Sequence, residues 1–136
     1  MGKIQISPYV NFQGRAREAM AFYHAVLGGN LDLHAIDEQG KAKPAGGGDR
    51  VALARLETDG ALILGGDGHP AYPPTVGDNL AIALTGIDKD RLTAAFNGLA
   101  EGGVVKMPPT RQPWGAEVGW MTDKFGINWT IAVEEE

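Results

Sequence analysis

The stretch AFYHAVLGG at residues 21–29 returns as AFNGLAEGG at residues 95–103, and this repeat decides the fold. The first and last pairs of the stretch are identical in the two copies, at an offset of 74 residues (21 to 95 and 28 to 102). Thr58-Asp59 returns as Thr122-Asp123, at an offset of 64 (58 to 122). A constant offset that shortens once predicts a duplicated unit whose first copy carries the longer loop.

The residues around the first copy predict a strand, a helix and three more strands. Alternation of apolar and polar residues favours a strand from Ile4 to Phe12, and Gly28-Gly29 ends the helix that follows. Apolar residues at helical spacing define the buried face of that helix: Ala16, Ala19, Met20, Tyr23 and Leu27. Further strands are expected at 31–36, 51–56 and 61–64, with a flexible loop at 37–49.

The second copy follows the same order. Asp88 is a candidate N-cap for the helix that ends at Gly102-Gly103, and strands are expected at 80–84, 104–107, 118–121 and 127–133. The apolar face of this helix consists of Leu92, Ala95, Phe96 and Leu99. Each copy is therefore βαβββ. The prediction is an α+β protein, a single domain over 1–136 whose two tandem modules, at about 3–65 and 78–133, form a curved mixed sheet around a shared cleft.

Composition excludes several classes of function. The chain has 136 residues, a net charge of -5 and no cluster of Lys and Arg, which disfavours nucleic-acid and membrane partners. Cysteine is absent, which excludes disulfides, thiol nucleophiles and thiolate metal sites. The N-terminus does not resemble a signal peptide, and no apolar run approaches the length of a membrane span, so a cytoplasmic protein is expected.

Two βαβββ modules resemble the vicinal oxygen chelate superfamily, which includes glyoxalase I, extradiol dioxygenases and bleomycin-resistance proteins. Three segments look like its PhnB-like branch: residues 8–12 (PYVNF), residues 18–29 and residues 123–129 (DKFGINW). The resemblance covers nearly the whole chain. Its motifs are a helix face, a glycine stop and a hairpin turn, so they are specific for the fold and weak for chemistry.

The resemblance also implies where a metal ion would bind. In metal-using members each module supplies one ligand from its first strand and one from its last, with His and Glu typical. These positions map onto Pro8, Leu64, Ala81 and Thr130. Proline, leucine and alanine offer no side-chain donor, and threonine offers a weak neutral one. We therefore expect no metal, no cofactor, no catalytic residue and no glyoxalase or ring-cleaving activity.

The mapped positions instead predict an apolar cleft. Residues two apart on a strand share a face, which extends the surface to their neighbours. Trp114 and Trp120 are placed near its mouth, Glu117 is placed over it, and Arg55 either holds a ligand carboxylate or lies on the plain surface. The predicted ligand-binding set is Pro8, Val10, Arg55, Leu62, Leu64, Ala81, Ala83, Trp114, Glu117, Trp120, Asn128 and Thr130. Such a lining suits a small apolar or aromatic molecule better than a metal.

Three interpretations stay open. The favoured one is a metal-free small-molecule binding module similar to bleomycin-resistance proteins. The second is an enzyme, either a metal-dependent lyase or dioxygenase or a metal-free catalyst that uses Glu117 or Arg55. The third is a structural or interaction protein with a vestigial cleft. His24, His34 and His69 show no ligand spacing and are expected to be structural or on the surface. Sheet edges and the resemblance predict a homodimer.

Overall fold

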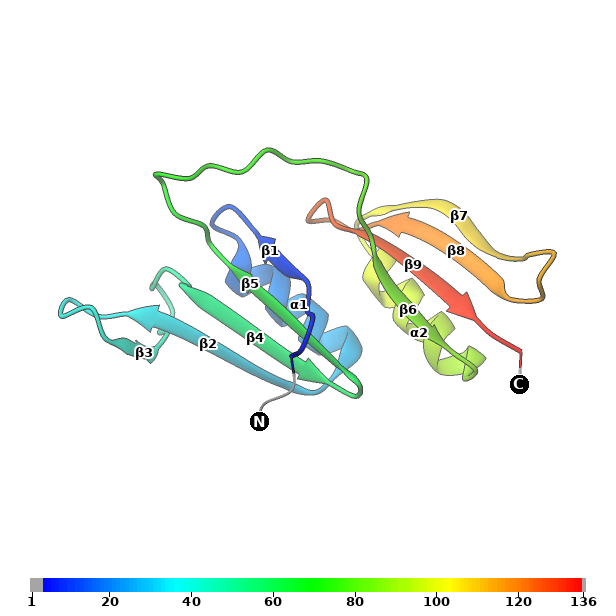
Figure 1. Cartoon of the computed structure of the whole chain (residues 1–136), viewed down its shortest axis with the longest axis horizontal. Helices are drawn as coiled ribbons and strands as arrows, with labels where there is room; N and C mark the ends of the chain where they lie inside the picture. The colour runs from blue at the N-terminus through cyan, green and yellow to red at the C-terminus, as the bar shows by residue number, and fades with distance from the viewer. Residues whose placement is uncertain (1–3, 136) are drawn as a thin grey trace. The chain divides into compact units, whose positions relative to one another are not determined.

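The structure is a computed structural model that describes residues 4–135, and this part of the chain forms nine strands and two helices (Figure 1). The chain divides into two compact units, Met1–Thr75 and Val76–Glu136. The second unit has the expected βαβββ order and the first has it with one added strand at Ala42–Pro44, so the α+β fold predicted from the repeat is confirmed. The assignment of both modules to one domain around a shared cleft stays a prediction.

The first unit is a five-stranded sheet covered on one face by a helix. Its strand order is β1 (Tyr9–Asn11), β5 (Ala61–Gly66), β4 (Leu53–Thr58), β2 (Asn30–Ile36) and β3 (Ala42–Pro44). Strand β1 runs parallel to β5, and the other pairs are antiparallel. Helix α1 (Ala16–Leu27) packs over β2, β4 and β5. Its four buried residues are all on the predicted face, namely Ala16, Ala19, Met20 and Tyr23.

The second unit repeats this arrangement with four strands. Their order is β6 (Ile82–Gly86), β9 (Asn128–Val133), β8 (Glu117–Thr122) and β7 (Val104–Arg111). Helix α2 (Lys89–Ala100) packs on β6 and β9 and buries Phe96 and Leu99. The Asp88 carboxylate accepts a hydrogen bond from the Arg91 N–H at 3.1 Å, which confirms the predicted N-cap. With β3 set aside, both units have the same strand order, as expected for a duplication.

Two expectations about the first unit are wrong. Residues 37–49 do not form one flexible loop, because β3 lies within them and pairs with β2 at the sheet edge. All three β3 residues are exposed and Pro44 is among them, so this strand has no apolar alternation to reveal it. The strand expected from Ile4 to Phe12 is shorter, since pairing with β5 covers only Tyr9–Asn11. The shortened offset predicted a longer segment in the first copy, and the structure shows that this segment contains β3.

The register defines an open face on each sheet, the face opposite its helix. Buried Ala54 and Leu56 of β4 point toward α1, and Arg55 between them lies on the open face beside Leu64. Buried Trp129 and Ile131 of β9 point toward α2, and Thr130 between them lies on the other open face. The open faces are therefore where the two sheets expose side chains. Among residues 4–135, no helix is long and apolar enough to cross a membrane.

Candidate functional site

In the first unit the register separates the predicted cleft residues. Leu62, Leu64 and Arg55 share the open face, as expected. Val10 pairs with Gly65, which pairs with Ala54, so Val10 lies on the helix side and its predicted position is wrong. The residue that shares a face with Leu64 is Tyr9. Pro8 precedes the strand, and its carbonyl accepts a hydrogen bond from the Leu64 N–H at 2.9 Å.

In the second unit four predicted residues share the open face. Ala83 pairs with Thr130, and Thr130 pairs with Trp120, whose side chain is 41% exposed. Asn128 also lies on this face but is buried, and its amide is used within the unit. It donates to the carbonyls of Asp78 and Leu80 at 3.1 Å each and accepts from Thr122 Oγ1 at 2.6 Å. Asn128 therefore holds the start of the unit together.

The two remaining polar and aromatic candidates lie elsewhere in the second unit. Glu117 pairs with Val133, which puts it on the helix side, and it forms an ion pair of 3.0 Å with Lys89 of α2. Its predicted place over the cleft is therefore wrong, because a side chain at this register cannot reach the open face. Trp114 is 72% exposed in the turn between β7 and β8. Ala81 is exposed and directly precedes β6.

The side chains at and beside the mapped metal-ligand positions do not fit a divalent metal. The register partners across the first and last strands are Tyr9 with Leu64 and Ala83 with Thr130. They offer a phenol, an isobutyl group, a methyl group and a hydroxyl, whereas Zn²⁺, Fe²⁺ and Ni²⁺ prefer imidazole, carboxylate or thiolate. Neither unit therefore offers side chains suited to such a metal, whether the positions are counted along the chain or taken from the register.

Two adjoining hollows lie at the carboxyl ends of the parallel strands β1 and β5. The first, which we call the Tyr72 hollow, encloses about 510 Å³ and is lined by Tyr9, Ile36, Arg50, His69 and Tyr72 among others. The second, the proline hollow, encloses about 380 Å³ and is lined by residues that include Pro70, Pro73 and Pro74. Asn11, Arg50, Gly68 and His69 line both hollows. These volumes are in the range of pockets that take small organic molecules.

Exposed aromatic and apolar side chains give the Tyr72 hollow its character. Tyr72 is 76% exposed, Ile36 63% and Tyr9 55%. The His69 ring contacts Tyr72 with ring centroids 5.5 Å apart. Because Tyr9 also shares its face with Leu64, the Tyr72 hollow continues the open face that the sequence predicted as apolar. A planar ligand could stack against these rings and remove their apolar area from water.

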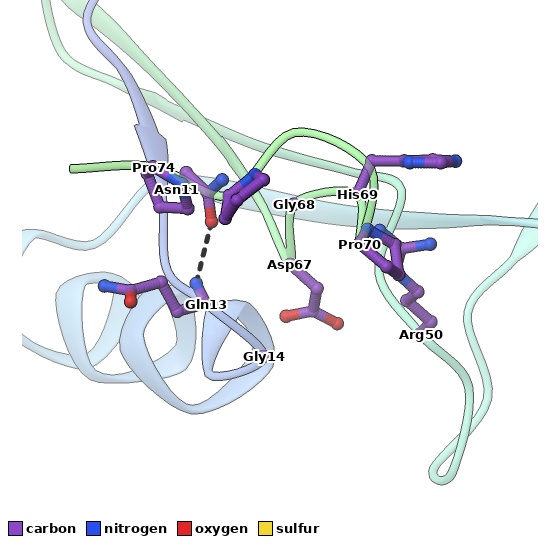
Figure 2. Close-up of a pocket in the computed structure, with 10 residues that line it drawn as sticks. Asn11, Gln13, Gly14, Arg50, Asp67, Gly68, His69, Pro70 and Pro74 are labelled. Atoms are coloured by element: carbon purple, nitrogen blue, oxygen red, sulfur yellow. Dashed lines mark hydrogen bonds between the residues drawn. The ribbon is translucent and has the colours of Figure 1, made fainter.

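Asp67 fixes the floor of the proline hollow. Its Oδ1 accepts the N–H of Ala16 at 2.8 Å, and its Oδ2 accepts the N–H of Val51 at 2.7 Å. Figure 2 shows this carboxylate between the β1 turn at Gly14 and the Arg50 side chain. The carboxylate lies at the N-terminus of α1, where the helix dipole favours negative charge, and α1 has no cap from its own N-cap residue. Both Asp67 oxygens therefore serve the fold.

The glycine-rich turn that precedes β4 is also fixed. The Arg17 guanidinium of α1 donates to the carbonyls of Ala45, Gly46 and Asp49. Asp49 Oδ2 accepts the Gly46 N–H at 2.8 Å and lies 3.4 Å from Lys43 Nζ. The Gly46 hydrogen bond and, next, the Lys43 ammonium lower the pKa of Asp49 below its ordinary value. These contacts hold the wall of the Tyr72 hollow in place.

Sequence reasoning missed the hollows because their residues come from separate segments without a motif. The sequence predicts a surface or structural role for His69 in the linker, and no pattern in it singles out Tyr72. The available signal was composition: the linker at 69–74 reads HPAYPP, which places two rings among three prolines. Prolines restrict the backbone within this segment and so favour a defined local conformation of residues 69–74.

Comparison with known proteins gives one family and several relatives. The family model described as 3-demethylubiquinone-9 3-methyltransferase matches residues 4–132. Protein PA1353 from Pseudomonas aeruginosa is 36% identical, with a TM-score of 0.82 over 98% of this chain and 100% of that one. Protein YjdN from Escherichia coli K12 is 27% identical over 96% of each chain.

More distant solved structures share the fold. The putative 3-demethylubiquinone-9 3-methyltransferase, PhnB protein, from Bacillus cereus is 22% identical, with a TM-score of 0.73 over 95% of this chain and 98% of that one. Proteins of the glyoxalase/bleomycin resistance/dioxygenase group from Burkholderia phytofirmans and Sphaerobacter thermophilus are 15% and 22% identical, with TM-scores of 0.60 and 0.56. At these identities the likeness concerns the fold alone.

Proposed function

Because this chain belongs to the PhnB-like family described as 3-demethylubiquinone-9 3-methyltransferase, within the glyoxalase/bleomycin-resistance superfamily, we propose that it is a metal-free module that binds a small apolar or aromatic molecule. The Tyr72 hollow carries the proposal, since it joins exposed rings to the open face of the first sheet beside Leu64. The family's description names a methyltransferase. No feature of the hollow favours methyl transfer over ligand binding.

The donor set supports the metal-free part of the proposal. Lewis-acid catalysis needs several protein ligands to hold the ion, and Tyr9, Leu64, Ala83 and Thr130 do not supply them. In the second unit, Trp120 on the open face and Trp114 in the turn before β8 also have exposed rings. We assign these residues to ligand binding as well, with Arg55 as a polar group beside Leu64.

A titration followed by amide NMR tests this function. Benzamide, a neutral aromatic probe, is added to the full chain in the presence of EDTA, and the titration is repeated with Zn²⁺ in place of EDTA. We expect saturable shifts at the backbone amides of residues 66–69, 71 and 72 that are the same in both series. Shifts that require Zn²⁺ would contradict the metal-free claim, and the absence of saturable shifts in either series would contradict binding.

We also propose that the chain forms a homodimer. Strands β1 and β6 end their sheets among the described residues, and Ile4 and Ile6 beside β1 are 94% and 95% exposed. Pairing of two copies would cover such edges and apolar side chains. Sedimentation at micromolar concentration should give about twice the chain mass of 14.4 kDa. A single species at the monomer mass would contradict the dimer.

A further inference from the structure

Arg50 is the charged group at the junction of the two hollows. Its side chain is exposed and lines both of them. Within residues 4–135, its guanidinium has neither an ion pair nor a hydrogen-bond partner. Figure 2 shows the Arg50 side chain on the His69 and Pro70 side of the proline hollow, with Asn11 on the other side. An arginine in a concave site is a fixed fork of N–H donors suited to a planar carboxylate.

The acidic side chains of the same hollows already have partners. Asp67 accepts two backbone N–H groups, and Asp49 accepts one and faces Lys43. Neither carboxylate forms a hydrogen bond or ion pair with Arg50 in the described chain. The positive charge of Arg50 is therefore not compensated by a carboxylate of the described residues. This favours binding of an anion at the junction of the two hollows.

Two neutral donors also line the junction. Asn11 Oδ1 accepts the Gln13 N–H at 2.9 Å. This contact identifies the oxygen end of the Asn11 side-chain amide, so its two N–H donors are at the Nδ2 end. His69 Nδ1 accepts the Ala71 N–H at 3.0 Å, so the neutral ring carries its proton on Nε2. Gly68 packs so closely on the Asn11 amide that an added Cβ would lie 2.5 Å from Nδ2. The amide orientation is thus restricted by its neighbours.

From these observations, and resting on the proposed function, we propose that the hollows take a small aromatic carboxylate. The ring lies in the Tyr72 hollow against Tyr9, Ile36 and Tyr72, and the carboxylate binds Arg50 at the junction. The proposal thus divides the ligand into an apolar part for the exposed rings and an anionic part for the unpaired guanidinium.

The test compares benzoate with benzamide, which has nearly the same shape without the charge. Dissociation constants for both are measured by amide NMR titration of the full chain at low ionic strength. We expect benzoate to bind roughly tenfold more tightly, the effect of one charge-assisted hydrogen-bonded pair in a partly exposed site. Arg50→Gln should remove this preference, so that benzoate and benzamide bind to the variant with equal affinity, whereas Arg50→Lys should keep part of it.

Lys41→Gln is the matched control, because it removes one positive charge from the same unit at an exposed side chain that does not line either hollow. This variant should keep the full preference for benzoate. Equal binding of benzoate and benzamide to the wild type would overturn the anionic assignment while the proposed function stands. A preference that survives in Arg50→Gln, or is lost equally in Lys41→Gln, would overturn the role of Arg50.

Discussion

At the scale of single residues, the repeated glycine pairs are explained by contacts with backbone. An added Cβ at Gly29 would meet the carbonyl oxygen of Glu57, and one at Gly103 would meet that of Thr122. The second glycine of each pair therefore packs directly on the chain where β4 or β8 ends. Those ends are Thr58-Asp59 and Thr122-Asp123, the second repeated sequence. The glycine pair and the Thr-Asp pair are thus the two partners of one packing contact, which forms once in each unit.

Alanine at either packed glycine should destabilise the protein. Gly29→Ala and Gly103→Ala force a methyl group onto backbone that cannot give way, so each should lower the free energy of unfolding by roughly 1–3 kcal/mol. Gly29 also has a φ of +90°, which adds strain for alanine. The control is Gly47→Ala, where nothing lies within 4 Å of the added carbon. Urea denaturation measures all three, and an equal effect of the control would contradict the contact.

Asp49 should titrate as an unusually acidic carboxyl. Its charged form accepts the Gly46 N–H and faces Lys43, which lowers its pKa below the ordinary value of 3.8. A lowered pKa means that the carboxylate's stabilising contribution is complete above pH 3.8 and is lost as the pH falls through the folded-state pKa. In carboxyl ¹³C NMR, Lys43→Gln should raise the pKa of Asp49. A wild-type value at or above 3.8 would contradict these contacts.

At the scale of elements, the two helices begin by different means. Helix α2 has a local cap from Asp88, a signal that sequence reasoning found. Helix α1 has no side-chain cap from its own N-cap residue, and its first N–H group, that of Ala16, is accepted by Asp67, which is 51 residues away. Sequence reasoning missed this cap because capping patterns are local in the chain. Asp67 also ties the same helix end to Val51, so one carboxylate joins α1, the end of β5 and the segment before β4.

Removal of these caps should give unequal losses of stability. Asp88→Ala removes one exposed capping bond and should cost about 1 kcal/mol of unfolding free energy. Asp67→Ala leaves two N–H groups without acceptors, one of them on buried Val51, and should cost about 2–4 kcal/mol. Chemical denaturation of both variants checks the order. A smaller loss for Asp67→Ala than for Asp88→Ala would contradict the role of the long-range cap.

At the scale of the whole molecule, the sequence predicts the architecture well and the site only in part. Helix faces and the βαβββ order of elements along the chain follow from periodicity and duplication, and both are confirmed, with β3 as an added strand in the first unit. The pairing of β1 with β5 does not follow from counting along the chain. Counting gives Pro8, and alternation along the strand adds Val10, whereas the ladder pairs Tyr9 with Leu64. A slip of one residue moves a side chain to the opposite face. The hollows depend on contacts between distant segments.

The most direct test of a metal-free binding function is a crystal structure of the protein grown with Zn²⁺ and soaked with benzamide, with anomalous data collected at the zinc edge. We predict density for the aromatic ring between Tyr9 and Tyr72, and no anomalous peak beside Tyr9, Leu64, Ala83 or Thr130. A zinc ion within bonding distance of Tyr9 or Thr130 would contradict the account, as would a Tyr72 hollow that stays empty of benzamide while the probe binds in solution.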